Sequence, residues 1–300
     1  MPDFTLLPDQ TILLIQIAAA LFVAAFLSFI YVTIDTIMSL IKLKKMAGTD
    51  TDNLLVCDVA YFHCKGKREN QEDSVYISHL EEAYNNGVIA ACSDGMGGLL
   101  YGEVVSQYVV EKLSESYPMK FEDPEANADI IRKISTEVYE QYRLGAGATL
   151  VMTHILKNKM NFYSVGDSNI ILIRKGRATL LNHKQNYVSL LIRKLAEGGM
   201  DTSEAYRNSR AKALIDFVGN IETNVMHTSK PIQLYEDDII IVSTDGVTDA
   251  MSLHRMANVL SPDYGAAHIA RIMKTTVKNK KLPKQDNYSA VVIKMDRSLI

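Results

Sequence analysis

Residues 88–98, Val88-Ile89-Ala90-Ala91-Cys92-Ser93-Asp94-Gly95-Met96-Gly97-Gly98, decide the fold. The apolar run indicates a buried strand, and the Asp-Gly after it indicates a sharp turn at the end of that strand. Asp94 is therefore expected at a strand tip, where a carboxylate can bind a metal ion. Gly95 lets the backbone come close to whatever the carboxylate binds. Asp-Gly is also a common turn sequence, so this stretch alone leaves a plain turn as the alternative.

A second stretch of the same kind lies far along the chain. Residues 238–246, Asp238-Ile239-Ile240-Ile241-Val242-Ser243-Thr244-Asp245-Gly246, again end a β-branched run in Asp-Gly. Further acidic residues border predicted strands in comparable settings: Glu72, Asp73, Asp167 and Asp286. Carboxylates that converge on one place repel one another unless cations neutralise them. Oxygen ligands suit hard divalent cations, and no His or Cys cluster in the sequence favours zinc.

Composition limits the classes of protein to which the chain can belong. It has 300 residues, 47% of them hydrophobic and 22% charged, which is an ordinary globular balance. The formal net charge of -3 argues against a general nucleic-acid binder, because there is no basic excess to neutralise phosphates. Cys57, Cys64 and Cys92 have no CxxC spacing, so we interpret them as core thiols in a reducing compartment.

The N-terminal region has the composition of a membrane anchor. Residues 10–34 carry no charged side chain, and residues 12–34 would span about 34 Å as a helix. No Gly or Pro interrupts this run, and acidic rather than basic residues precede it, which disfavours a cleaved signal peptide. Lys42, Lys44 and Lys45 follow the run, so the positive-inside rule places the remainder of the chain in the cytoplasm. We therefore expect a single-pass protein of the cytoplasmic membrane.

The predicted organisation has three parts. Residues 1–46 form the transmembrane anchor and a juxtamembrane segment, residues 47–53 form a small, polar linker, and residues 54–300 form one domain of sufficient size for a large core. In this domain, strand patterns follow one another without regular helical crossovers, which favours antiparallel sheets. One predicted helix begins at Gly102, and it should bury Val104 together with Val105. Further helices are predicted over residues 125–143, 187–195 and 266–277.

One basic run stands apart from these elements. Residues 278–284, Lys278-Asn279-Lys280-Lys281-Leu282-Pro283-Lys284, are expected to form a solvated loop. The alternative is contact with lipid headgroups or with an acidic partner.

The acidic motifs match those of a known family. They are Arg68-x-x-x-Glu72-Asp73, Asp94-Gly95-Met96-Gly97-Gly98 with Gly102-Glu103, Gly147-Ala148-Thr149, Gly166-Asp167-Ser168, Asp245-Gly246-x-x-Asp249 and Asp286-Asn287. In this order and spacing, from about residue 54 to the C-terminus, the chain resembles the metal-dependent protein serine/threonine phosphatases of the protein phosphatase 2C family, in their bacterial form.

The resemblance implies an α+β fold, a four-layer αββα sandwich of two antiparallel sheets flanked by helices, here preceded by one transmembrane helix. It also implies two Mg²⁺ or Mn²⁺ ions and allows a third. Asp94 would bridge the two ions, the Gly95 carbonyl would help to hold one, and Asp245 and Asp286 would complete the other. Glu72 and Asp73 would bind metal directly or through water, and Asp167 and Asp249 would form a weaker third site. Arg68 would bind the phosphate. Gly147, Thr149 and Asn287 would support the site.

The function that the resemblance implies is hydrolysis of phosphoserine and phosphothreonine in proteins, by in-line attack of a water that bridges the two ions. An opposing Ser/Thr kinase is the expected counterpart. Three positions depart from the family pattern, Gln71, Met96 and Asn169, and the proton donor to the leaving oxygen stays unassigned. Two alternatives remain: a catalytically silent, membrane-tethered pseudophosphatase that binds phosphoproteins, and a metal-dependent hydrolase of small phosphate esters.

Overall fold

The computed structural model describes residues 55–96, 101–143, 146–196 and 210–297, without the side chains of 194–196. The chain divides into two units, Met1–Asn53 and Leu54–Ile300, and all the described residues belong to the second. The predicted anchor and linker, like Gly97 and Gly98, therefore lie outside the described residues. Within the described residues, no helix combines the length and the apolar character needed to cross a bilayer.

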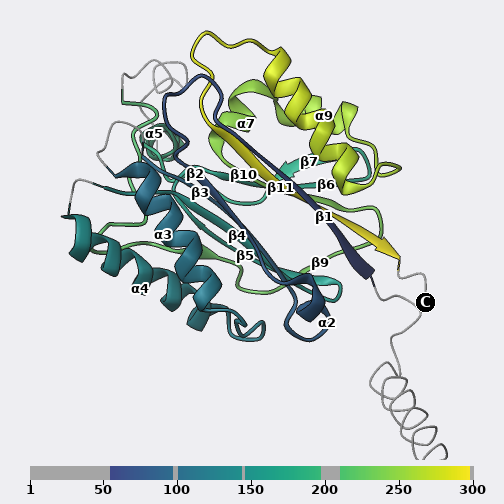
Figure 1. Ribbon diagram of the computed structural model, residues 1–300, viewed down its shortest axis with the longest axis horizontal. Coiled ribbons are helices and arrows are strands. Elements are labelled where there is room, and N and C mark those ends of the chain that lie inside the picture. The colour runs from purple at the N-terminus through teal and green to yellow at the C-terminus, as the bar shows by residue number, and fades with distance from the viewer. Residues whose placement is uncertain (1–54, 97–100, 144–145, 197–209, 298–300) are drawn as a thin grey trace, which may run out of the picture. The chain divides into compact units, whose positions relative to one another are not determined.

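Two antiparallel sheets make up the centre of the second unit (Figure 1). The first has the order β1-β11-β10-β6-β7, with bounds Leu55–Cys64, Tyr288–Arg297, Ile239–Ser243, Asn169–Arg174 and Arg177–Leu180. The second has the order β2-β3-β4-β5-β8, with bounds Asp73–Ile77, Val88–Asp94, Leu150–Leu156, Lys159–Val165 and Met226–His227, and β9, Ile232–Gln233, also pairs with β5.

Helices cover the outer face of each sheet. The second sheet is covered by α3 (Gly102–Glu115) and α4 (Pro124–Tyr142), and the first by α7 (Asp245–Ala250), α8 (Leu253–Val259) and α9 (Ala266–Asn279). The described part also contains η2 (Leu80–Glu82), α2 (Ala83–Asn86) and α5 (Tyr187–Ala196). The predicted pair of antiparallel sheets flanked by helices is confirmed.

The apolar runs of the sequence are continuous because both faces of each sheet are covered. In β10, Ile239 and Ile241 pack towards α8 and α9, while Ile240 and Val242 pack into the cluster between the two sheets. Side chains alternate along a strand, so each face needs its own apolar partners. The α–β–β–α order of layers follows from these three separate apolar clusters.

One core prediction was wrong. Val104 is 48% exposed, whereas its neighbour Val105 is fully buried. The buried face of α3 contains Val105, Val109 and Leu113, which recur at intervals of four residues. Each residue turns the helix by about 100°, so Val104 points away from the sheet.

The antiparallel topology collects the predicted site residues at one end of the sandwich. Neighbouring antiparallel strands run in opposite directions, so the end of β3, the start of β4 and the end of β5 lie side by side at one end of the sheet. In the other sheet, the end of β10 and the start of β11 lie side by side at the same end of the sandwich. Acidic motifs far apart in the sequence therefore lie at the same end of the fold.

Candidate functional site

Asp73 and Asp94 form the central pair of the site. They face each other across the β2–β3 ladder, Asp73 as the first residue of β2 and Asp94 as the last residue of β3. Two carboxylates directly opposite each other repel. This register is consequently unfavourable unless protons or cations neutralise the pair.

The side chain of Asp73 is fixed by hydrogen bonds to one of its oxygens. Thr244 Oγ1 and Ser289 Oγ donate to Asp73 Oδ2 at 3.0 and 2.7 Å. The other oxygen, Oδ1, is buried and has no hydrogen-bond partner among the described residues. A buried carboxylate oxygen without a partner is costly, and its free lone pairs are suited to a cation.

Burial raises the pKa values of the carboxyl groups here. Burial is the largest cause of the rise for Asp73, to about 7, despite the lowering effect of its two hydrogen bonds. Burial also raises the pKa of Asp94 well above its ordinary value, and the charges of Asp73, Asp245 and Asp286 add to the rise. The pKa of Asp245 rises to about 7 through burial and the charges of nearby carboxylates. These carboxyl groups therefore interact strongly although the strands next to them belong to two different sheets.

The backbone around Asp94 is held by the start of β4. Thr149 N–H donates to the Asp94 carbonyl at 2.8 Å, and the Asp94 N–H donates to Thr149 Oγ1 at 3.1 Å. Thr149 Oγ1 also lies 2.7 Å from Ser168 Oγ, beside Asp167. Met96 N–H donates to the Gly147 carbonyl. Gly147 and Thr149 therefore fix the turn that follows β3.

Glycine is required where segments of backbone touch. A Cβ on Gly95 would lie 2.2 Å from the Gly102 carbonyl oxygen, and one on Gly246 would lie 2.0 Å from the Asn287 carbonyl oxygen. Real Cβ atoms do not approach other atoms so closely. Gly95 thus lets the turn after β3 contact the start of α3, and Gly246 lets α7 contact the start of β11.

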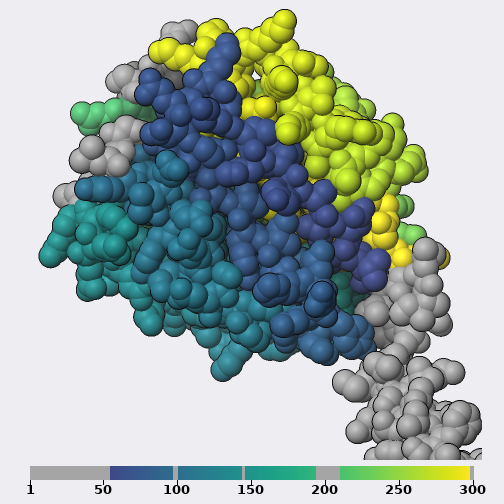
Figure 2. All heavy atoms as spheres, in the orientation of Figure 1, coloured from purple at the N-terminus to yellow at the C-terminus, as the bar shows by residue number. Residues whose placement is uncertain are grey.

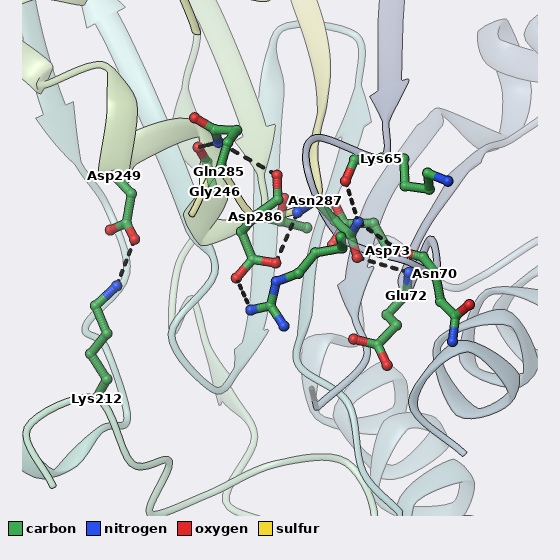
Figure 3. Close-up of polar contacts among 12 residues, drawn as sticks. Lys65, Asn70, Glu72, Asp73, Lys212, Gly246, Asp249, Gln285, Asp286 and Asn287 are labelled. Carbon is green, nitrogen blue, oxygen red and sulfur yellow. Dashed lines mark hydrogen bonds and ion pairs between the residues drawn. The ribbon is translucent and has the colours of Figure 1, made fainter. Parts of the chain in front are cut away.

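Asn287 connects the loop between β1 and β2 to the start of β11 (Figure 3). Its Nδ2 donates to the carbonyls of Lys65 and Asn70 at 2.7 and 3.0 Å, and its Oδ1 accepts from Glu72 N–H at 2.9 Å. All the hydrogen-bonding groups of this side chain are used within one loop. Glu72 is held in place by this bond, and burial raises its pKa.

Arg68, from the same loop, pairs with Asp286. The distance from Arg68 NH2 to Asp286 Oδ2 is 2.6 Å, and the two side chains are 46% and 35% exposed. The hydrogen bond to Asp286 raises the pKa of Arg68, so its guanidinium stays charged. A partly exposed cation at the rim is available to phosphate oxygens from solvent.

Asp167 and Asp249 lie beside Asp245. Asp167 is 8% exposed, Asn186 Nδ2 approaches its Oδ2 at 3.4 Å, and burial raises its pKa. Asp249, on α7, pairs with Lys212 at 2.6 Å, as Figure 3 shows. The charges of Asp167 and Asp249 both raise the pKa of Asp245.

The donor set fits hard divalent cations in its chemistry, because it offers carboxylate and carbonyl oxygens and includes a buried oxygen without a partner. The ligand geometry is a separate matter. Across the described parts of the chain, no three Asp, Glu, His or Cys side chains are grouped so that they could hold one ion. The structure brings the predicted carboxylates to one end of the sandwich but does not show a finished ligand set.

Sequence reasoning missed several polar residues of the site. Thr244 and Ser289 hold Asp73, Gln285 Nε2 donates to the Gly246 carbonyl at 3.2 Å, and Lys212 binds Asp249. The first three lie within three residues of predicted motif positions, so polar neighbours of the motifs were the available signal. No local pattern in the sequence marks Lys212.

Comparisons with known proteins agree with this geometry. The family model described as "Protein phosphatase 2C" matches residues 63–285. The serine/threonine protein phosphatase PstP of Mycobacterium tuberculosis is 26% identical over 197 residues, which cover 62% of this chain and 35% of that relative. This chain therefore spans well under two thirds of the length of that relative.

Solved structures show the same fold. The structure of the S. agalactiae serine/threonine phosphatase has a TM-score of 0.70 at 21% identity, and the match covers 80% of this chain and 99% of that chain. The catalytic domain of PstP in complex with two manganese ions has a TM-score of 0.64 at 23% identity and covers 81% and 99% of the two chains. At these identities the likeness supports the fold alone.

Proposed function

The chain belongs to the protein phosphatase 2C family, and we propose that it is a metal-dependent phosphatase that hydrolyses phosphoserine and phosphothreonine in proteins. The observation that carries the proposal is the pairing of Asp73 with Asp94 across β2 and β3, with one buried oxygen of Asp73 left without a partner among the described residues. The phosphatase names of the relatives support the same activity.

We propose Mg²⁺ or Mn²⁺ as the cofactor, as two ions with room for a third. Asp94, the Gly95 carbonyl, Asp73 and Glu72 would hold one side of the centre, and Asp245 and Asp286 the other. Asp167 and Asp249 would form the additional site. When bound, such ions neutralise phosphate charge and lower the pKa of a water molecule. A structure of PstP that contains two manganese ions supports this choice of metal.

The residues of this chain supply orientation and charge. Thr244 and Ser289 keep the Asp73 carboxylate from rotating, and Asn287 holds Glu72 just before the start of β2. The Arg68 guanidinium presents a planar fork that can bind two phosphate oxygens of the substrate. The bond to be broken lies between phosphorus and the Ser or Thr oxygen, and the products are the free hydroxyl and inorganic phosphate.

The cellular setting is also a proposal. The apolar residues 12–34 would anchor the chain in the cytoplasmic membrane, and the Lys residues after them would keep residues 54–300 in the cytoplasm. An enzyme placed there would act on proteins that a Ser/Thr kinase has phosphorylated.

The test is phosphate release from a phosphothreonine peptide by the full chain, with Mn²⁺ and with a chelator. We expect turnover that depends on Mn²⁺. Binding of the phosphopeptide without any turnover would favour the pseudophosphatase. Turnover of small phosphate esters alone would favour the small-ester hydrolase.

A further inference from the structure

A strongly basic surface extends from α9 towards the candidate site. Residues 271–285 contain six basic side chains and no acidic one, in a chain with a net charge of -3. All six are exposed, and we call them the basic face: Arg271, Lys274, Lys278, Lys280, Lys281 and Lys284. None of the ion pairs found among the described residues involves any of them.

The helix itself does not account for these charges. Lys278 lies in the last turn of α9, where a cation interacts favourably with the helix dipole. Arg271 and Lys274 lie in the middle of the helix, one turn apart, where like charges repel each other. An external anionic partner would offset this repulsion.

The basic face continues into the candidate site. The loop that carries Lys280, Lys281 and Lys284 also carries Asp286, and within it the Gln285 carbonyl accepts from Lys67 N–H at 2.9 Å. Figure 1 shows the loop before β11 beside the loop after β1. Because Lys67 precedes Arg68, the two basic segments meet next to the proposed phosphate-binding residue.

A groove lies beside the helical part of the basic face, between α9 and β1. Tyr61 and His63 line it from β1, and Arg271 and Lys274 line it from α9. Tyr61 is 61% exposed, and β1 is the end strand of its sheet, hydrogen-bonded to β11 on one side. In Figure 2, β1 (purple) lies directly against the C-terminal region (yellow) on this face. An edge strand with free backbone groups can bind an extended peptide.

We propose that the basic face and this groove bind an acidic polypeptide segment that flanks the phosphorylated residue of the substrate protein. This inference rests on the proposed function and adds a class of substrate to it. An extended chain can enter the groove between α9 and β1, whereas a flat bilayer surface cannot. At about 3.3 Å per residue, a few residues span the distance from Arg271 to Lys278, which is about 10 Å along the helix.

The test compares two phosphothreonine peptides that differ only in a flanking run of Asp or of Asn. The full chain should hydrolyse the Asp peptide with kcat/KM roughly five- to tenfold higher, mainly through KM, because several rim charges each contribute modestly. The triple variant Arg271→Ala/Lys274→Ala/Lys278→Ala should lose this preference. The control Lys175→Ala/Arg177→Ala removes two exposed charges from the β6–β7 hairpin, at the other end of the strands, and should keep it.

The outcomes separate this inference from the proposed function. Equal hydrolysis of both peptides, or a preference that survives in the triple variant, overturns the inference when a small phosphate ester is still hydrolysed with Mn²⁺. If no substrate is hydrolysed, the proposed function fails, and fluorescence anisotropy of labelled peptides decides the inference: equal affinity for Asp and Asn peptides overturns it. Hydrolysis is also measured with phosphatidylserine vesicles. If the Asp peptide is not preferred, and if the vesicles activate the unmodified chain but not the triple variant, the inference is overturned and the basic face is assigned to lipid instead.

Discussion

Asp73 illustrates how single residues set the energetics of the site. Its carboxylate is 2% exposed and receives two hydrogen bonds on one oxygen, yet burial still raises its pKa to about 7. Hydrogen bonds to an anion lower a carboxyl pKa, so the desolvation of this group exceeds their combined effect. The burial of these carboxylates therefore lowers the stability of the fold, and binding of a proton or a cation can reduce this loss.

Asp245→Asn removes one of these charges with little change in shape. We expect a loss of Mn²⁺-dependent activity of at least about 100-fold, since even outer-shell changes around a metal cost 10–100-fold. The variant in chelator should melt at the same temperature as the unmodified chain or slightly above it, because a buried charge is gone. Phosphopeptide turnover and thermal unfolding measure the two effects, and wild-type turnover would show that Asp245 does not belong to the centre.

The raised pKa values predict an unusual pH dependence of the metal-free protein. Asp73 and Asp245 titrate near 7 when folded but near 4 when unfolded, so between these values the folded state holds more protons. The free energy of unfolding should therefore fall as the pH rises from about 5 to about 7. Thermal unfolding in chelator measures this, and the variant Asp73→Asn/Asp245→Asn should show a flatter profile. An identical slope in the double variant would contradict the prediction.

At the scale of elements, the candidate site is assembled by the joint between the β1–β2 loop and the start of β11. Neither segment positions its own charged side chains alone: Glu72 is held by Asn287, and Arg68 pairs with Asp286. Asn287 is 3% exposed, whereas Lys65 and Asn70, whose carbonyls it binds, lie at the surface. The joint thus couples the position of a loop to a strand of the central sheet.

Asn287→Ala should loosen this joint. Loss of the three hydrogen bonds made by this buried side chain should lower the free energy of unfolding by about 2 kcal/mol. The Mn²⁺ concentration for half-maximal activity should also rise, because Glu72 is no longer held. Urea unfolding and metal titration measure the two effects. Asn279→Ala, an exposed position at the end of α9, is the control and should change neither.

At the scale of the whole molecule, the two ends of the sandwich differ in character. One end carries the carboxylates. At the other, Arg174 at the end of β6 binds Asp238 through two hydrogen bonds of 2.7 and 2.6 Å and also donates to the Gln233 carbonyl of β9. Because β6 and β9 belong to different sheets, this residue ties the two sheets together. Asp238 is 1% exposed, so this ion pair is shielded from water on the acidic side.

Asp238→Ala should therefore reduce stability without changing catalysis. Removing one partner of a buried ion pair leaves the other charge uncompensated. We expect the free energy of unfolding to fall by about 3 kcal/mol, the lower end of the usual range for such pairs, because Arg174 is partly exposed. The kcat/KM of the folded fraction should stay unchanged. The control Glu236→Ala removes an exposed neighbour whose ion pair with Arg297 lies at the surface, and it should cost less than about 1 kcal/mol. Parallel denaturation and kinetics test this, and a similar loss of kcat/KM would contradict the separation of the two ends.

The sequence by itself determined the element types and the identity of the acidic motifs. Apolar runs such as that of β10 predicted buried strands, and Asp-Gly at their ends predicted turns, because these signals are local. The α3 face was predicted only in part, since Val104 and Val105 are equally apolar and only packing against the sheet distinguishes them. The order of strands in the two sheets decided that the acidic motifs share one end.

Only the tertiary structure decided which polar groups support the site. The hydrogen bonds of Thr244 and Ser289 to Asp73 join residues more than 170 positions apart, and the pairing of Lys212 with Asp249 depends on how a loop lies against α7. The meeting of the basic face with the β1–β2 loop is likewise absent from the linear order. The physical reason is that these groups become buried, and come close to one another, only once the two sheets are packed. No short-range pattern in the sequence encodes the distance between residues that are far apart along the chain.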